Sequence, residues 1–228
     1  MMLSLTLTAR RAAALGLLAV LFCSGASRSH AASAERRHVL AMNICGSWDG
    51  CPYDQHEHLY RWIVDHVDSF RSQGKSPWII TLNEVCETQF SSIHDELAIR
   101  GYDYQSTFLQ AGTQVCRNGL GKYGNAIFYT SKTASLLKYR TFINQRQPRP
   151  TDDGTLKERR AILCVTATDN TYSACVTHLV NQDPDTTEDE TAIAKEQAKE
   201  AVDFMAGLPD GPRILGADLN LQWREATA

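Results

Sequence analysis

The sequence predicts an α/β protein in which helices cover β-sheets, and three observations support this fold class. The first part of the chain alternates short apolar strands with amphipathic helices, a rhythm typical of sheets packed under helices. The middle is a run of strand-like segments joined by polar turns, which favours antiparallel pairing. The last part returns to one helix and one short apolar strand. With 228 residues the chain can bury one sizeable core, so we expect a single domain.

The N-terminal segment has the three zones of a secretory signal. Arg10 and Arg11 precede an apolar run over residues 12–22, and small residues follow it. The run is too short to span a bilayer. We therefore assign residues 1–32 to a signal peptide and expect a secreted protein with no stable membrane insertion. A twin-arginine signal is the weaker alternative, because the residues around the arginine pair fit it poorly.

The chain that remains after the signal is mildly acidic. The signal contains three arginines and no acidic residue, so 20 basic residues face 26 acidic ones, a net charge of −6. This balance argues against binding nucleic acid through a broad basic surface. A metal ion is then the expected source of positive charge opposite a phosphate.

Cysteine usage predicts disulfides, because six cysteines remain once Cys23 is removed with the signal. They are Cys45, Cys51, Cys86, Cys116, Cys164 and Cys175. Six cysteines allow 15 pairings. The expected strands favour Cys45–Cys51 as a local loop. They also favour Cys164–Cys175 across a hairpin. Cys86 and Cys116 are then the two cysteines that are left to pair with each other. A zinc site is the minor alternative, because no Cys-x-x-Cys occurs.

The first half of the chain reads as two strand–helix units. Residues 38–44 and 77–82 are continuous apolar runs, expected to be buried strands. Between them, apolar side chains recur every three or four residues, which places them on one face of a helix. They are Leu59, Trp62, Ile63, His66, Val67 and Phe70. A second helix follows the second strand, with Phe90, Ile93 and Leu97 turned inward.

The second half adds five strands, one helix and a final strand. The expected strands cover residues 102–109, 125–130, 135–139, 161–168 and 172–179. A helix over about 187–206 begins with acidic residues and stops at Gly207 and Pro209. Residues 213–216 form a short buried strand that leads to Asp218 and Asn220.

Polar side chains follow four of the apolar runs, where strands are expected to end. They are Asn43, Glu84, His178 and the pair Asp218 and Asn220. Each alone has an ordinary structural explanation, as a turn former, an acid at a helix start or a buried histidine. Together they supply oxygen ligands for a hard divalent cation, a carboxylate to orient water, an amide donor and an imidazole. Strand carboxyl ends converge on one crevice in open α/β sheets, so we expect these side chains to lie together.

Five short motifs occur in the order found in the endonuclease/exonuclease/phosphatase superfamily. They are Met42-Asn43-Ile44-Cys45-Gly46, Leu82-Asn83-Glu84-Val85, Gly124-Asn125-Ala126-Ile127, Thr177-His178-Leu179 and Gly216-Ala217-Asp218-Leu219-Asn220. Over roughly residues 38–221 the sequence therefore resembles this superfamily, which includes pancreatic-type deoxyribonucleases, sphingomyelinases and inositol-polyphosphate phosphatases. The resemblance implies a four-layer αββα sandwich of two mixed sheets, and we assign residues 38–228 to that domain.

The resemblance also implies a metal site. Glu84 would be the principal ligand of Mg²⁺, or of Mn²⁺ or Ca²⁺ in its place, with Asn43 beside it. Asp218 would orient the attacking water or hold a second metal position.

Other residues would then contact the substrate. Asn220 would steady the pentacovalent phosphorus, His178 would contact or protonate a phosphate oxygen, and Asn125 would contact the phosphate. For the pair Arg159 and Arg160 a surface role is favoured over phosphate contact, because an exposed basic pair is ordinary. The implied substrate is a phosphoester in a nucleic acid, a phospholipid head group or an inositol phosphate, and we expect a monomer.

Members of the superfamily usually continue past the Asp-x-Asn motif to a final strand that ends in Ser-Asp-His. After Asn220 this sequence has only residues 221–228, so we expect the C-terminal part of the domain to be missing, together with core strands and a second imidazole. The leading hypothesis is a secreted metal-dependent phosphoesterase, with a nuclease as one option. The rival is a non-catalytic secreted binding module or an inactive truncated relative. A disulfide-stabilised protein with no link to phosphate is the third hypothesis.

Overall fold

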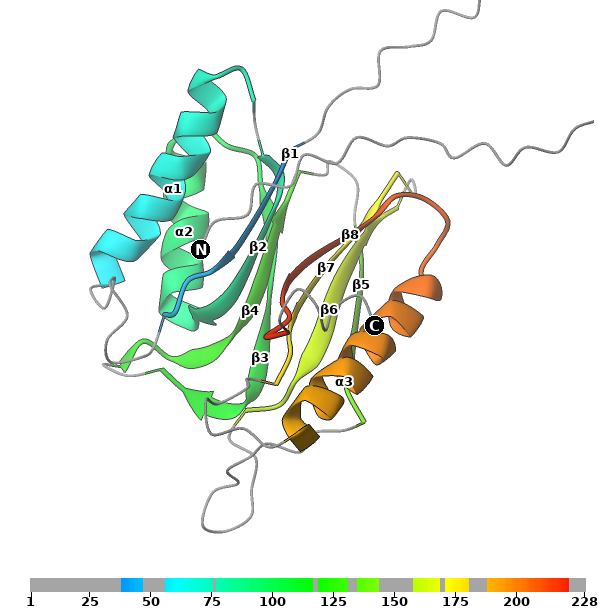
Figure 1. Cartoon of the computed structure of the whole chain (residues 1–228). Coiled ribbons are helices and arrows are strands. Elements are labelled where there is room, and N and C mark those ends of the chain that lie inside the picture. The colour runs from blue at the N-terminus through cyan, green and yellow to red at the C-terminus, as the bar shows by residue number, and fades with distance from the viewer. Residues whose placement is uncertain are drawn as a thin grey trace, which may run out of the picture.

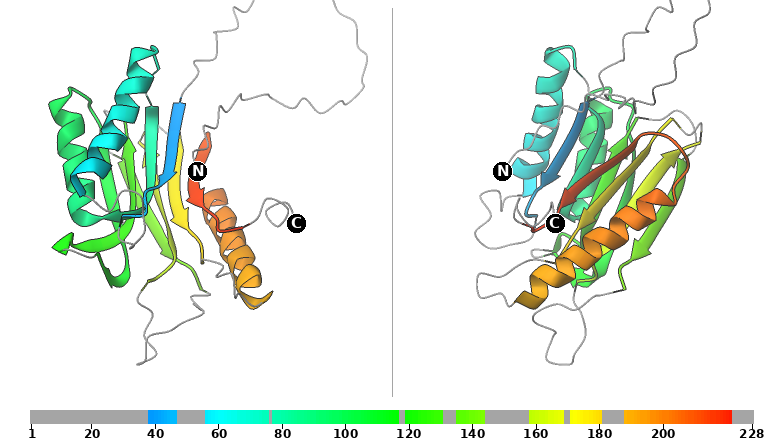
Figure 2. Two further views of the ribbon diagram at one scale, coloured as in Figure 1. Left: turned by 60° about the vertical axis from the view of Figure 1, so that its left-hand side comes forward. Right: turned by 45° about the vertical axis from the view of Figure 1, so that its right-hand side comes forward.

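Two four-stranded sheets face each other and carry helices on their outer faces (Figures 1 and 2). The computed structural model describes residues 38–46, 56–75, 77–116, 119–130, 135–143, 158–168, 171–180 and 188–221. The expected signal peptide, residues 1–32, lies outside the described residues. Across the described ranges, we find no helix long and apolar enough to span a bilayer.

The first sheet has the strand order β1-β2-β4-β3 and lies under two helices (Figure 1). Its elements are β1 (His38–Asn43), α1 (His56–Ser72), β2 (Pro77–Cys86), α2 (Glu87–Ile99), β3 (Gln105–Val115) and β4 (Lys122–Tyr129). The β1–β2 pair is parallel, whereas β4 runs antiparallel to both β2 and β3.

The second sheet has the order β5-β6-β7-β8 and lies under α3. Its elements are β5 (Ser135–Thr141), β6 (Ala161–Ala167), β7 (Ser173–His178), α3 (Glu188–Ala206) and β8 (Arg213–Asp218). Here β5–β6 and β6–β7 are antiparallel and β7–β8 is parallel. Both sheets are therefore mixed, which confirms the expected four-layer αββα sandwich.

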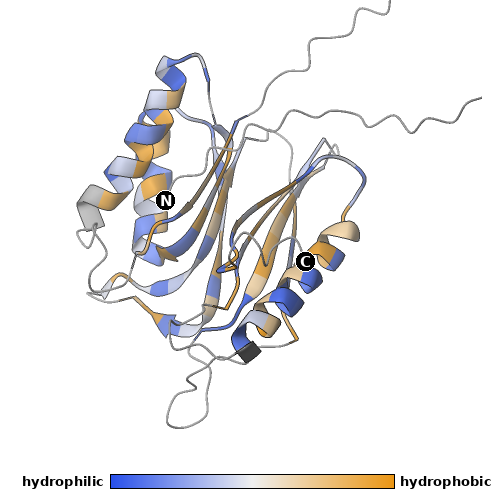
Figure 3. Ribbon diagram, viewed as in Figure 1, coloured by the Kyte–Doolittle hydropathy of each residue, from blue (hydrophilic) through white to orange (hydrophobic). Residues whose placement is uncertain are grey.

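Three apolar layers hold these four layers of secondary structure together. Leu59 and Ile63 of α1 pack with Ile80 between the first sheet and its helices. Ile79 and Leu163 lie between the two sheets. A third cluster lies between the second sheet and α3. In Figure 3 the central strands are largely hydrophobic, and the visible sides of α1 and α3 carry hydrophilic residues. Each fully buried aliphatic side chain stabilises this arrangement by about 1.5–3 kcal/mol.

All eight predicted strands and three predicted helices are present, but two strands differ in length. The predicted second strand ends at residue 82, whereas β2 continues to Cys86. Its polar continuation stays paired because Asn83 is buried and Val85 pairs with Gly124 of β4. The strand predicted over 102–109 runs over Gln105–Val115.

Two of the three disulfide pairings that the sequence favours join cysteines that are both among the described residues, and both are confirmed. Cys164 and Cys175 lie directly opposite each other on β6 and β7 and are bonded. Cys86–Cys116 joins the end of β2 to the end of β3. Cys45 is also disulfide-bonded, and Cys51, its expected partner, lies outside the described residues.

Candidate functional site

Glu84 of the first sheet meets His178 and Asp218 of the second at the carboxyl ends of their strands. His178 Nε2 lies 3.7 Å from Glu84 Oε1 and 4.0 Å from Asp218 Oδ2. One ligand atom from each of the three residues lies within 4.8 Å of the others. Two carboxylates and an imidazole at this spacing could hold a divalent cation, since carboxylate oxygens are the preferred ligands of Mg²⁺ and Ca²⁺.

Asn43 stands between the two carboxylates. Its Nδ2 donates to Glu84 Oε1 at 2.9 Å and to Asp218 Oδ2 at 2.8 Å. Its Oδ1 instead accepts a hydrogen bond from the backbone N–H of Cys45 at 2.9 Å. The structure therefore brings Asn43 to the expected place, but with its nitrogen turned to the carboxylates. To serve as a metal ligand, the amide would have to flip and give up the bond from Cys45.

The backbone at Glu84 is in an uncommon conformation. Its φ is +59°, and it lies within the irregular pairing of β2 with β4 between Leu82 and Val85. A left-handed conformation in a residue other than glycine costs about 1–3 kcal/mol and is concentrated at functional sites. Burial raises the pKa of Glu84, and the nearby carboxylate of Asp218 raises it further, while the hydrogen bond from Asn43 opposes both. A bound cation would favour the ionised carboxylate.

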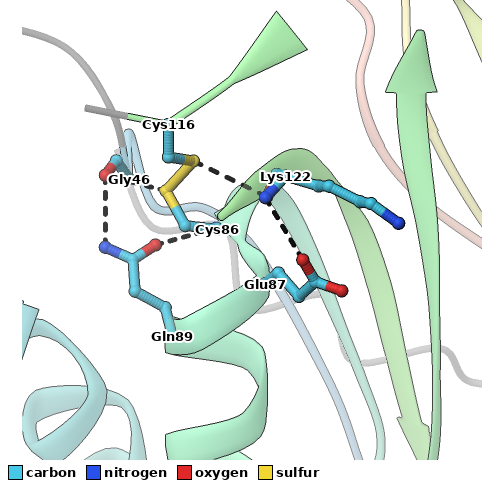
Figure 4. Close-up of a disulfide and its surroundings, with 6 residues drawn as sticks. All are labelled: Gly46, Cys86, Glu87, Gln89, Cys116 and Lys122. Atoms are coloured by element: carbon cyan, nitrogen blue, oxygen red, sulfur yellow. Dashed lines mark hydrogen bonds between the residues drawn. A yellow bond between two sulfur atoms is a disulfide. The ribbon is translucent and has the colours of Figure 1, made fainter. Parts of the chain in front are cut away.

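Figure 4 shows contacts of Gln89 with Gly46 and Cys86, which hold the chain close to Glu84 in the sequence. The Gly46 N–H donates to Glu84 O at 2.8 Å. Gln89 Oε1 accepts from the Cys86 N–H at 2.9 Å, and its Nε2 donates to Gly46 O at 3.2 Å. A Cβ on Gly46 would lie 2.5 Å from the backbone oxygen of Glu84, so only glycine fits there without a backbone shift. Together with the Cys86–Cys116 disulfide, these contacts tie the end of β1 to the junction of β2 and α2.

His178 is almost completely buried, with 4% of its surface exposed. Its Nδ1 lies 3.7 Å from Glu158 Oε1 and makes no hydrogen bond to the described residues. Burial lowers the pKa of His178 well below its usual value, and the positive charge of Arg160 lowers it further. The imidazole is therefore neutral near pH 7.

The preference for a surface role is wrong for Arg160. Only 5% of Arg160 is exposed, and its Nη1 lies 2.7 Å from Glu158 Oε1. Arg159 is exposed, as expected. The alternation of side chains along extended backbone places residues 158 and 160 on one side and residue 159 on the other. The buried partner Glu158 compensates the charge of Arg160, which makes the burial tolerable.

The two remaining predicted site residues are held by hydrogen bonds. Asn220 Nδ2 donates to Leu179 O at 2.9 Å, and its backbone N–H donates to Asp218 Oδ1 at 3.1 Å. Asn125 is buried on β4 and accepts a hydrogen bond from Asn83 Nδ2 at 2.9 Å. Asn83 therefore contacts Asn125 in space and directly precedes Glu84 in the sequence.

Three residues near the site are not among the site residues predicted from the sequence. Glu158 and Tyr123 are both buried, and Tyr123 forms a side-chain hydrogen bond with Glu84. Asn83 is the third. Glu158 could have been found as part of a Glu-x-Arg pair directly before an apolar strand, and Asn83 as a second polar residue beside Glu84. Neither pattern is specific to a functional site.

Comparisons with known proteins agree with this fold. No family model and no curated protein matches the sequence. The structure of the human Nocturnin catalytic domain with bound sulfate has a TM-score of 0.54 and 18% identity, over 81% of this chain and 64% of that domain. An endonuclease/exonuclease/phosphatase family protein from Bacteroides thetaiotaomicron has a TM-score of 0.53 and 15% identity, over 82% and 62%.

Humanized D. rerio TDP2 is a third similar structure, with a TM-score of 0.51 and 13% identity over 83% of this chain and 68% of that one. The chain spans less than two thirds of the Nocturnin catalytic domain, 64% of its length. At these identities the similarity establishes the fold. The two sheets and their covering helices have the fold of the endonuclease/exonuclease/phosphatase superfamily.

Proposed function

We propose that this protein is a secreted hydrolase that cleaves phosphoester bonds with the help of a divalent metal ion. The observation that carries the proposal is the convergence of Glu84, His178 and Asp218 within 4.8 Å at the strand ends of two sheets. The fold supports it, and so does the buried arginine whose charge reaches both Glu84 and His178.

The donor set fits Mg²⁺ or Mn²⁺, since two carboxylates provide hard oxygen ligands on facing sheets. Glu84 and Asp218 would hold the ion. When bound, the ion would supply positive charge to a phosphate oxygen.

The residues around these ligands have separate roles in the proposal. Asp218 also orients Asn220 through its backbone N–H, which places an amide beside the phosphate. The neutral imidazole of His178 receives or returns a proton at Nε2, the nitrogen that faces Glu84 and Asp218. Arg160 adds a positive charge close to the substrate oxygens.

We propose phosphodiesters of single-stranded nucleic acid as the first substrates to test. A structure of D. rerio TDP2 complexed with single-strand DNA product has the same fold, with a TM-score of 0.52 and 15% identity. The mild acidity of the chain favours recognition at the metal site over capture by a basic surface. Secretion is supported by the composition of residues 1–32 and by disulfides, which persist in oxidising compartments.

The test combines several phosphoesters with metal removal. The chain from residue 33 onward, with its disulfides intact, is mixed with a chromogenic phosphodiester, single-stranded DNA or a phospholipid, in Mg²⁺, Mn²⁺ or excess chelator. We expect hydrolysis that chelator abolishes and that Glu84→Gln removes. Glu87→Gln is the matched control, because Glu87 lies three residues away and its carboxylate contacts only the Lys122 N–H, at 3.4 Å, among the hydrogen bonds described. Hydrolysis that survives chelator would contradict the metal dependence. Hydrolysis of none of the substrates would favour the non-catalytic binding module.

A further inference from the structure

Asn83 lies at the point where the two sheets meet beside the site. It is 2% exposed and precedes Glu84 on β2. Its Nδ2 donates to Thr177 O at 2.8 Å and to Asn125 Oδ1 at 2.9 Å. Its Oδ1 accepts from the Asp218 N–H at 3.1 Å. One amide therefore connects β2 to β4 in its own sheet and to β7 and β8 in the opposite sheet.

Two partners of Asn83 belong to or adjoin the proposed metal-site cluster. Thr177 directly precedes His178 on β7, and Asp218 is bound through its own backbone. Both donor hydrogens and the oxygen of the Asn83 amide are used, so its orientation is determined by three strands at once.

A further hydrogen bond between the sheets, from Asn43 Nδ2 to Asp218 Oδ2, lies within the site itself. Away from the site, the sheets meet through an apolar cluster that has no directional preference. Ile79, Leu163 and their neighbours favour burial, but they do not specify how far one sheet is displaced along the other. Hydrogen bonds do specify it, because they weaken steeply with distance and angle. A shift of the sheets would change the separation of Glu84 from Asp218, on which cation binding depends.

We propose that Asn83 is the positioning residue of the metal site: it holds Glu84 on one sheet at a constant distance from His178 and Asp218 on the other. This inference rests on the proposed function for the existence of a bound cation. Asn83 itself contacts neither cation nor substrate, and it acts through the backbone of the residues that do.

The experiment measures Mn²⁺ binding by the free-ion signal in electron paramagnetic resonance, together with phosphodiester hydrolysis. Asn83→Asp keeps the shape and the acceptor for the Asp218 N–H, and it loses both donors. By charge alone, a new carboxylate beside the site would strengthen Mn²⁺ binding. The positioning role predicts the opposite, a 10- to 100-fold weaker affinity, which is typical when residues that orient metal ligands are changed.

Two further variants separate positioning from general stability. Asn83→Leu removes all three hydrogen bonds without adding charge, and we expect it to weaken Mn²⁺ binding at least as much. Thr81→Val is the matched control. Thr81 lies two residues earlier on β2, is equally buried and contacts Gly216 of β8. Its hydroxyl makes no hydrogen bond to the described residues, so Mn²⁺ affinity should stay within about twofold of the wild type.

The outcomes distinguish this inference from the proposed function. A wild type that binds no Mn²⁺ contradicts the proposed function. A wild type that binds Mn²⁺, with folded Asn83→Asp and Asn83→Leu variants of equal affinity, contradicts only the positioning role. If neither variant folds while Thr81→Val does, Asn83 is a structural residue and the positioning role is also overturned.

Discussion

The two halves of the candidate site are built in different ways. On the second sheet, β7 and β8 pair in an unbroken parallel register that places His178 directly opposite Asp218. On the first sheet the irregularity includes the ligand itself, because φ is +59° at Glu84 within β2 and +52° at Cys45. On the second sheet the only such residue among those described, Asn220 with a φ of +49°, follows the end of β8. Contacts outside the regular strand pairing hold the half on the first sheet, above all those of Gln89 and the Cys86–Cys116 disulfide.

This difference indicates which half of the site needs contacts outside the regular strand pairing to keep its conformation. A regular strand pair determines the position of its side chains through many backbone hydrogen bonds, so the loss of one support changes little. An irregular segment keeps its conformation only while the surrounding structure imposes it. We therefore expect cation affinity to respond more strongly to changes around Glu84 than to comparable changes around His178 and Asp218.

The largest expected effect is that of Glu84→Gln, which removes a ligand from the irregular half. Loss of several kcal/mol of transition-state stabilisation lowers the hydrolysis rate by about 10³-fold or more. Without metal, the same variant should be more stable than the wild type at pH 7. Burial raises the pKa of Glu84 above its ordinary value of 4.5. The contribution of Glu84 to wild-type stability is then largest below pH 4.5 and is lost as pH rises through the raised pKa.

Urea unfolding in chelator at pH 4.5 and pH 7 measures this stability effect. The advantage of Glu84→Gln should grow with pH, because glutamine does not titrate. If the wild type is instead more stable than the variant at pH 7 without metal, the hydrogen bonds of Glu84 already compensate the cost of burying its negative charge.

The second prediction compares the two described disulfides. Their sequence separations are 30 and 11 residues, so loop entropy predicts losses of about 4 kcal/mol for Cys86→Ala/Cys116→Ala and about 3 kcal/mol for Cys164→Ala/Cys175→Ala. The two double variants are thus similar in stability. Only the first should also weaken Mn²⁺ binding, because only that disulfide supports the irregular half. Equal loss of affinity in both variants would remove the distinction between the halves.

The third prediction concerns Gln89, whose side chain connects Cys86 to Gly46. Gln89→Leu leaves a buried N–H and a carbonyl without a side-chain partner, which costs about 1–3 kcal/mol. We expect Mn²⁺ affinity to fall by roughly tenfold. Ser91→Ala on the same helix is the control, since that hydroxyl bonds only within α2 and its loss should cost less than about 0.5 kcal/mol. Unchanged affinity in Gln89→Leu would mean that the disulfide alone is a sufficient support.

The smallest predicted effect is the pH dependence of stability due to His178. Burial and Arg160 lower the pKa of this imidazole well below its ordinary value of 6.5. The unfolded chain then binds the extra proton below pH 6.5, so the contribution of His178 to stability is lost as pH falls through that value. Between pH 7.5 and pH 5.5 this linkage amounts to about 1.4 kcal/mol.

Comparison with His178→Asn isolates the contribution of the imidazole. Glu84 and Glu158 have raised pKa values, so they favour folding as pH falls. Because both carboxyl groups are present in both proteins, the difference between wild type and variant reports on His178. A difference in unfolding free energy that does not change with pH would show that the histidine is not buried in the neutral form.

The fold and much of the site could be predicted because their signals are local. Apolar runs and three- to four-residue spacings depend on neighbouring residues, and they predicted every element of both sheets. The strand-end positions of Glu84, His178 and Asp218 were equally visible, because carboxyl ends of strands converge in this class of fold.

The features that could not be predicted depend on residues far apart in the sequence. The orientation of the Asn43 amide depends on Asp218, 175 positions away. Arg160 is buried close enough to His178, 18 positions away, for its charge to lower the pKa of that imidazole. The role of Asn83 depends on carbonyl and amide groups of the opposite sheet, for which composition and spacing carry no signal.

The central claim is that Glu84 and Asp218 together bind a divalent cation. It is tested most directly by soaking crystals of the wild-type protein in Mn²⁺ and recording anomalous diffraction. We predict one strong peak within about 2.0–2.5 Å of a carboxylate oxygen of both residues, with Asn43 displaced from its present position between them. A difference map with no peak there, and with the Asn43 amide still donating to both carboxylates, would contradict the account.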